Sequence, residues 1–162
     1  MSAARVVRTT IVVGALVVLQ FALEPLMPWR VSADFMVIAL LYGAVRMRPG
    51  AAAVLGFSLG LVTDSLTLGG FGAGALALTV VGFSASWLKA LFFADNLALN
   101  AFFLFLGKWA FDLVYVLAMH NLSLGAMLAQ LFIWSVLSAA VTAVAGVVLM
   151  AILRPLDAAR RA

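Results

Sequence analysis

Long apolar stretches alternate along the chain with short breaks in which proline, glycine and basic residues gather. The stretches are nearly continuous, so they show neither the spacing of a surface helix nor the alternation of a half-buried strand. We predict six helices, at residues 9–27, 33–45, 51–68, 71–88, 97–119 and 124–153. The breaks are no longer than about ten residues, as between adjacent helices in a compact bundle. Residues 1–162 are therefore predicted to form a single domain.

Composition identifies the solvent around these helices. Hydrophobic residues make up 67% of the chain and charged residues 10%, whereas a soluble domain is about half apolar and a quarter charged. A chain of this size has too little polar surface to cover so much apolar surface in water. The sequence therefore predicts an all-α integral membrane protein, a compact bundle of six transmembrane helices.

Two of the stretches depart from the length that a membrane crossing needs, which is about 20 residues. The stretch 33–45 would be about 20 Å long, so we expect its neighbours to shield it from lipid. The stretch 124–153 would be about 45 Å long. It is expected to tilt, to protrude, or to begin with an interfacial turn around residues 123–130.

The charges between the stretches indicate the topology. The basic residues on the side of the termini are Arg5, Arg8, Arg46, Arg48, Lys89, Arg154, Arg160 and Arg161. The opposite loops carry Arg30 alone, so the positive-inside rule predicts that both termini are cytoplasmic. A cleaved signal peptide is the alternative for the first stretch, but Glu24, Pro25 and the lack of a small-residue cleavage site favour a retained helix.

Several kinds of chemistry are excluded by residue type. The chain has no cysteine, and His120 is its one histidine, which argues against thiolate or histidine metal sites and a Ser-His-Asp triad. Residues 70–75 fit a dinucleotide-binding pattern, but that pattern works only between a strand and a helix. The basic residues are dispersed, which does not suit nucleic acid. We expect no enzymatic activity, catalytic residue, cofactor, metal or nucleic-acid partner.

Small residues recur at intervals of about four along three of the helices, where they would let helix backbones approach closely. These faces contain Ala52, Gly56 and Gly60; Gly70, Gly74, Gly82 and Ser86; and Ser135, Ala139 and Ala143. We interpret them mainly as packing surfaces within the bundle. A face that docks a helix of a partner is the alternative.

Apart from Glu24 near the end of the first stretch, four acidic or basic side chains lie within or at the start of the apolar stretches. Asp64 continues the Gly56–Gly60 face, about 20 Å from the cytoplasmic edge. Lys108 and Asp112, one helical turn apart, fall in the same depth range. We predict a polar cluster of Asp64, Lys108 and Asp112, provided that the third and fifth helices are neighbours. Asp34 is predicted to cap the start of the second helix.

Buried charges in a membrane suggest either a proton or ion path or a structural network. A relay needs titratable groups across both halves of the membrane, and the cytoplasmic halves of these helices have none. The structural interpretation is therefore favoured.

Residues 29 to 90 resemble the MreD family of bacterial rod-shape-determining membrane proteins. The similarity lies in Trp29 before Ala33-Asp34-Phe35, in Gly56-x-x-x-Gly60-x-x-x-Asp64-x-Leu66, and in the glycine-rich turn before Ala75-Leu76-Ala77-Leu78. The family usually has proline where this chain has Ala33.

The resemblance implies a non-enzymatic scaffold of the elongasome in the bacterial cytoplasmic (inner) membrane. Its implied partners are MreC, the RodA glycosyltransferase with its penicillin-binding transpeptidase, MreB filaments and membrane lipid, and its implied roles are rod shape and lateral peptidoglycan synthesis. The family also resembles, in fold, the substrate-binding (S) subunits of energy-coupling-factor vitamin transporters, which supply the alternative function. Those subunits carry Ala-x-x-x-Ala in the first helix, where this chain has Gly14-x-x-x-Val18 and Ala15-x-x-x-Leu19.

Overall fold

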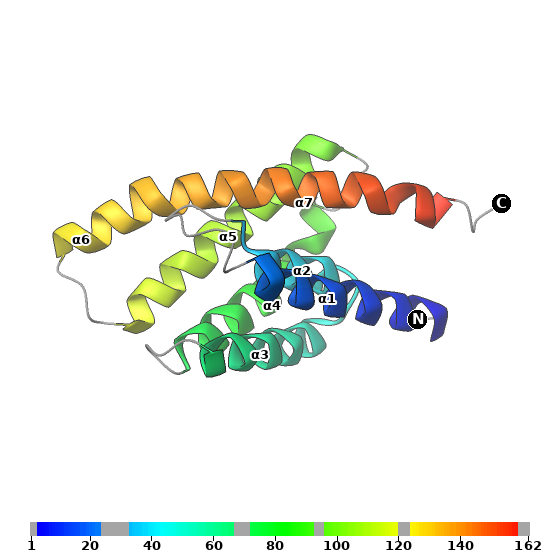
Figure 1. The fold of residues 1–162 in the computed structure, drawn as a ribbon, viewed down its shortest axis with the longest axis horizontal. Helices are drawn as coiled ribbons and strands as arrows, with labels where there is room; N and C mark the ends of the chain where they lie inside the picture. The colour runs from blue at the N-terminus through cyan, green and yellow to red at the C-terminus, as the bar shows by residue number, and fades with distance from the viewer. Residues whose placement is uncertain (1–2, 24–32, 67–71, 93–95, 120–123, 159–162) are drawn as a thin grey trace.

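The computed structural model describes residues 3–23, 33–66, 72–92, 96–119 and 124–158, and its regular elements are all helices. In chain order they are α1 (Ala3–Leu23), α2 (Phe35–Ala44), α3 (Pro49–Leu66), α4 (Ala73–Phe92), α5 (Leu97–Met119), α6 (Leu124–Ala129), η2 (Gln130–Trp134) and α7 (Ser135–Ala158). The last three follow one another without a break as one long rod (Figure 1). The described part of the chain thus has six helical segments, each overlapping a predicted one.

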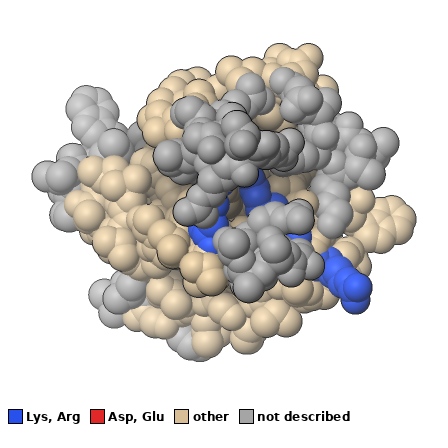
Figure 2. All heavy atoms as spheres, turned by 90° about the vertical axis from the view of Figure 1, so that its right-hand side faces the viewer, with Lys and Arg blue, Asp and Glu red and all other residues tan. Residues whose placement is uncertain are grey.

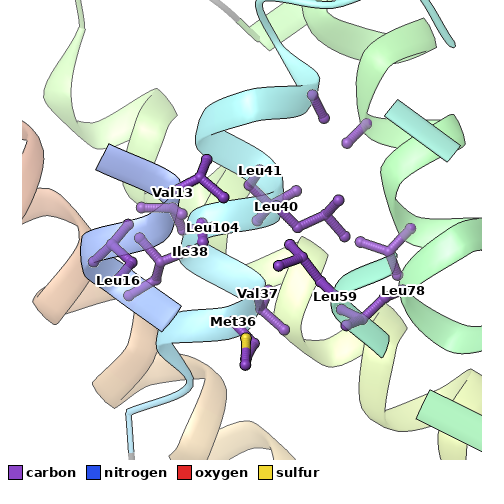
Figure 3. Close-up of a cluster of buried hydrophobic side chains, with 14 of the residues drawn as sticks. Val13, Leu16, Met36, Val37, Ile38, Leu40, Leu41, Leu59, Leu78 and Leu104 are labelled. Atoms are coloured by element: carbon purple, nitrogen blue, oxygen red, sulfur yellow. The ribbon is translucent and has the colours of Figure 1, made fainter. Parts of the chain in front are cut away.

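Helix α2 lies at the centre of the bundle. It packs against α1, α3, α4, α5 and α7, and all its residues from Met36 to Ala44 are buried. Figure 3 shows its leucine, valine and isoleucine side chains between Val13 and Leu16 of α1, Leu59 of α3 and Leu78 of α4. The core is therefore built around the shortest of the six segments.

The sequence of α2 explains this central position. Its ten residues, FMVIALLYGA, are apolar around the whole circumference of the helix, and such a helix has to be surrounded by other helices or by lipid. Because ten residues are too few to cross lipid, neighbouring helices have to surround it. The prediction that the second helix would be shielded by its neighbours is confirmed. The next helix starts with Pro49 as its first residue, where a missing N–H has no cost.

Two helices of the described part are long and apolar enough to cross a membrane, at Leu97–Met119 and Met127–Ile152. Three shorter apolar helices accompany them, at Val7–Leu23, Phe35–Ala44 and Ala73–Leu88. The prediction of an all-helical protein is confirmed for the described residues. Figure 1 also shows that α1 begins and α7 ends at the same end of the molecule.

The last segment runs from residue 124 to residue 158 and changes its winding once. At η2 each backbone hydrogen bond spans five residues instead of four. The Ser135 N–H, for example, donates to the carbonyl oxygen of Gln130. Such π turns occur mostly as single turns within α-helices. The interfacial turn that the sequence offered as one alternative around residues 123–130 is not seen over Leu124–Ala129, which are helical, and the widened turn lies after them, at Gln130–Trp134. Residue 123 lies outside the described residues.

Helices α3 and α4 pack more closely than any other pair, through their small-residue faces. A Cβ atom added at Gly56 would meet the Leu78 carbonyl oxygen, one at Gly60 would meet the Ala75 backbone, and one at Gly82 would meet the Ala52 carbonyl oxygen. Glycine is therefore the residue that permits this approach. The packing interpretation is confirmed for these faces.

The other small residues have similar places, as far as they are described. Ala139 and Ala143 on α7 are buried, and Gly74 faces the Asp64 carboxylate. Gly72 has a φ of 100°, which favours glycine and supports the predicted turn before the fourth helix. Gly70 lies outside the described residues, as does Met27, the predicted end of the first helix.

Replacing Gly56 with alanine is expected to destabilise the protein by about 1 to 3 kcal/mol, because the added methyl group forces α3 and α4 apart. Gly14→Ala is the matched control, since nothing lies within 4 Å of the added methyl group there. In an exposed helix position that change should be neutral or stabilising by up to about 1 kcal/mol. Thermal unfolding in detergent measures both. Equal melting temperatures for the two variants would contradict the close packing.

Candidate functional site

A buried ion-pair cluster joins α2 and α5. The Lys108 ammonium on α5 is 2.9 Å from Asp34 Oδ2 and 2.7 Å from Asp112 Oδ1. Lys108 is 6% exposed, and it lies one helical turn before Asp112 on the same helix. The predicted pairing of Lys108 with Asp112 is present in the structure, and Asp34 is the second carboxylate.

Asp34 serves two elements at once. Its Oδ1 accepts a hydrogen bond of 3.1 Å from the Val37 N–H, which caps α2 as the sequence predicted, while its Oδ2 binds Lys108. The N-terminus of a helix carries a partial positive charge, so the carboxylate is stabilised from two sides. The short helix α2 is therefore fixed at its start both by its own cap and by an ion pair to α5.

Two neutral side chains extend this junction to the first and last helices. The Asp34 N–H donates to Thr142 Oγ1 of α7 at 3.1 Å, and the Phe35 N–H donates to Gln20 Oε1 of α1 at 2.8 Å. The first N–H groups of a helix have no partner within the helix. Here other helices supply those partners, so the start of α2 ties together α1, α2, α5 and α7.

Sequence reasoning missed Gln20 and Thr142 because each stands alone in an apolar run. The signal that could have found them is their type, since a polar side chain in a membrane helix usually faces another helix and hydrogen-bonds across it.

The widened turn η2 lies next to the cluster. Trp109 Nε1 on α5 donates to the Leu131 carbonyl oxygen at 3.3 Å, so the indole binds a backbone group within the widened turn. The Ser135 hydroxyl at the end of η2 is 1% exposed and lies beside the Asp112 carboxylate. It makes no hydrogen bond with a described group, which is unusual for a buried polar atom.

Aromatic rings line the α5 side of the cluster. The Lys108 ammonium is 4.7 Å from the centroid of the Phe111 ring, which stacks on Tyr115 at 5.7 Å between centroids. The face of an aromatic ring attracts a cation when water is excluded. The lysine is therefore held by two carboxylates and a ring.

Asp64 belongs to a different site, which corrects the predicted cluster. It is 2% exposed, and its two carboxylate oxygens accept hydrogen bonds from the N–H groups of Gly72, Gly74 and Ala75 at 2.9, 3.0 and 2.9 Å. These groups form the start of α4, so Asp64 of α3 caps the following helix. The physical reason is that helix starts attract carboxylates, and the start of α4 is the next element along the chain.

The described carboxylates are thus bound to a lysine or to backbone N–H groups, which makes them suited to holding helices in place. Among the described residues, no three or more histidine, cysteine, aspartate or glutamate side chains lie close enough to hold a metal ion. The expected lack of catalysis and cofactors stays a prediction. Comparison with protein-family models, curated proteins and solved structures gives no match for this chain.

Proposed function

We propose that the chain is a multi-pass membrane protein with six crossings. The distribution of apolar and polar side chains supports this. Large apolar side chains are exposed on the outer helices, among them Ile11, Val54, Val80, Phe102 and Val144, whereas Asp64, Lys108, Ser135 and Thr142 are buried. Of the most apolar 18-residue part of each of the two long helices, 28% is buried inside the bundle. The core helix of a soluble protein is mostly buried, so these surfaces suit contact with lipid.

Both termini are assigned to the cytoplasm in this proposal. The argument is the charge distribution: Arg46 and Arg48 follow α2, at the end of the molecule where α1 begins and α7 ends. Basic residues gather on the cytoplasmic side of membrane proteins. An even number of crossings then places both termini in the same compartment.

Within the membrane the chain acts as a non-enzymatic scaffold. The observation that carries this step is the Lys108 cluster, in which Lys108 binds both Asp34 and Asp112, and Asp34 also caps a helix. A catalytic site instead pairs a nucleophile with a base near a position for a substrate. The described charges fix helix positions, which is what a scaffold requires.

The larger assembly is proposed to be the bacterial elongasome. Support comes from the sequence similarity of residues 29 to 90 to the MreD family. In this role the chain binds MreC in the cytoplasmic membrane and supports RodA, its penicillin-binding transpeptidase and MreB filaments during lateral peptidoglycan synthesis.

Copurification from membranes tests this role. The tagged full-length protein is expected to recover MreC and the wall synthases, and its depletion is expected to turn rod-shaped cells round. An unrelated tagged six-helix membrane protein controls for carry-over in detergent micelles. Recovery of an ATPase pair and a transmembrane coupling protein would overturn the proposal in favour of a vitamin-transporter subunit.

A further inference from the structure

The Lys108 cluster has one carboxylate more than it has cations. In the described part of the chain, the ion pairs of Asp34 and Asp112 are both with Lys108, so two negative charges share one positive charge. Asp34 is also stabilised by the partial positive charge at the start of α2, through the Val37 N–H. Asp112 lies within α5, so its own helix offers it no such charge. The excess negative charge is therefore centred on Asp112.

Other described basic residues stand far from this excess charge. Arg46 and Arg48 follow the end of α2, whereas Asp34 precedes its start, and a helix of ten residues separates them by about 15 Å. Figure 2 shows the end of the molecule at which α1 begins and α7 ends, where Lys and Arg atoms appear and no described acidic atom is visible. Because an uncompensated charge within a membrane is costly, Asp112 calls for a further positive charge close by.

The Ser135 hydroxyl is an oxygen ligand next to this charge. A hydroxyl within a helix commonly donates to the carbonyl oxygen four residues back, as the Ser58 hydroxyl does in α3. For Ser135 that carbonyl belongs to Leu131, which lies in the widened turn η2 and accepts the Trp109 indole N–H. The Ser135 hydroxyl is buried without a hydrogen bond to a described group, and it lies beside the Asp112 carboxylate. Its lone pairs are therefore available to a ligand at Asp112.

The charge and the ligand atoms suit a monovalent cation. Carboxylate and hydroxyl oxygens are hard ligands, which bind hard cations. One positive charge balances the cluster, whereas a divalent ion would leave a buried positive charge without a partner. The side chains of Lys108, Asp34 and Asp112 are 8%, 19% and 15% exposed, so a single ion reaches them more readily than a side chain of another protein does. The sequence argument against metal sites concerned thiolate and histidine ligands, which such an ion does not need.

We propose that Asp112 and Ser135 bind a sodium ion, which completes the charge balance of the Lys108 cluster. Sodium ions in membrane transporters are held by oxygen atoms at points where a helix is irregular, and the widened turn η2 ends at Ser135. Single π turns occur frequently at functional sites. The bound ion joins α5 to the start of α7 and so stabilises the bundle. Sodium binding goes beyond the scaffold role and needs no wall-synthesis partner.

Thermal unfolding of the purified full-length protein in detergent tests the site. At equal ionic strength, sodium chloride is expected to raise the melting temperature by about 2 to 4 °C over choline chloride, because a ligand of the folded state stabilises it. Ser135→Ala should weaken sodium binding about 10-fold and remove most of this difference. It should still fold, since the hydroxyl has no hydrogen bond with a described group. Asp112→Asn keeps the pair of Lys108 with Asp34 and should also remove the response to sodium.

Ser58→Ala is the matched control, since its hydroxyl donates to a carbonyl oxygen of its own helix, and this variant should keep the full response to sodium. Equal melting temperatures of the wild type in sodium and choline would overturn the site. A response that both Ser135→Ala and Asp112→Asn retain would place the ion elsewhere and would also overturn it. A melting temperature that follows pH but not sodium would show that a proton supplies the missing charge, which rules out the sodium site.

Discussion

Replacing Lys108 with leucine is expected to destabilise the protein by about 3 to 5 kcal/mol. The Lys108 ammonium is the counter-charge that Asp34 and Asp112 share, at 2.9 and 2.7 Å, and its removal leaves both buried carboxylates without one. An unpaired charge within a membrane costs at least about 2.5 to 3.5 kcal/mol by itself. Unfolding of the purified protein by increasing SDS in mixed micelles measures the loss, and the yield of membrane-inserted protein should fall with it.

The matched control removes all three charges together. The variant with Asp34→Asn, Lys108→Leu and Asp112→Asn leaves no buried charge at the cluster, and asparagine at position 34 still caps α2. A buried ion network can often be replaced by neutral groups of similar size without loss of stability. We therefore expect the triple variant to recover most of the stability that Lys108→Leu loses. If both variants are equally unstable, the lysine acts through its packing, and the charge argument is wrong.

The helices could be predicted because their signal is local. Each apolar stretch carries its own length, and proline, glycine or basic residues mark its ends, so the six segments follow from the sequence without knowledge of their contacts. The shielding of α2 by its neighbours could also be predicted, since the stretch 33–45 is too short to cross lipid alone. The widened turn η2 was not accessible. Nothing in QLFIW distinguishes it from an ordinary helical turn.

The cluster was predicted only in part, because pairing between helices depends on which helices are neighbours. Counting residues placed Lys108 and Asp64 at a similar depth, but depth does not give the direction around the bundle. Lys108 meets the start of α2, which packs against α5. Asp34 was recognised as a cap, and one carboxylate can serve as both cap and counter-ion. That double role is visible only when the helices are assembled.

Asp64→Ala is expected to destabilise the protein by about 2 to 4 kcal/mol, because three N–H groups at the start of α4 lose their acceptor in a buried place. An acid in the last turn of α3 opposes the dipole of its own helix, so the cap on α4 is what favours aspartate here. SDS unfolding measures the global loss. Limited proteolysis should show faster cleavage between α3 and α4, since the cap joins the two helices.

Two further variants separate the cap from general effects of substitution in this turn. Asp64→Asn retains an amide oxygen that can accept one or two of the three N–H groups, so its stability should lie between wild type and Asp64→Ala. Ser65→Ala is the matched control, since Ser65 is exposed and its hydroxyl donates to the Leu61 carbonyl oxygen of its own helix. Because the α3–α4 pair is the most closely packed part of the bundle, loss of the cap should also weaken recovery of MreC in the proposed assembly. Wild-type stability and MreC recovery in Asp64→Ala would make the three hydrogen bonds dispensable and would remove Asp64 from the residues on which the scaffold depends.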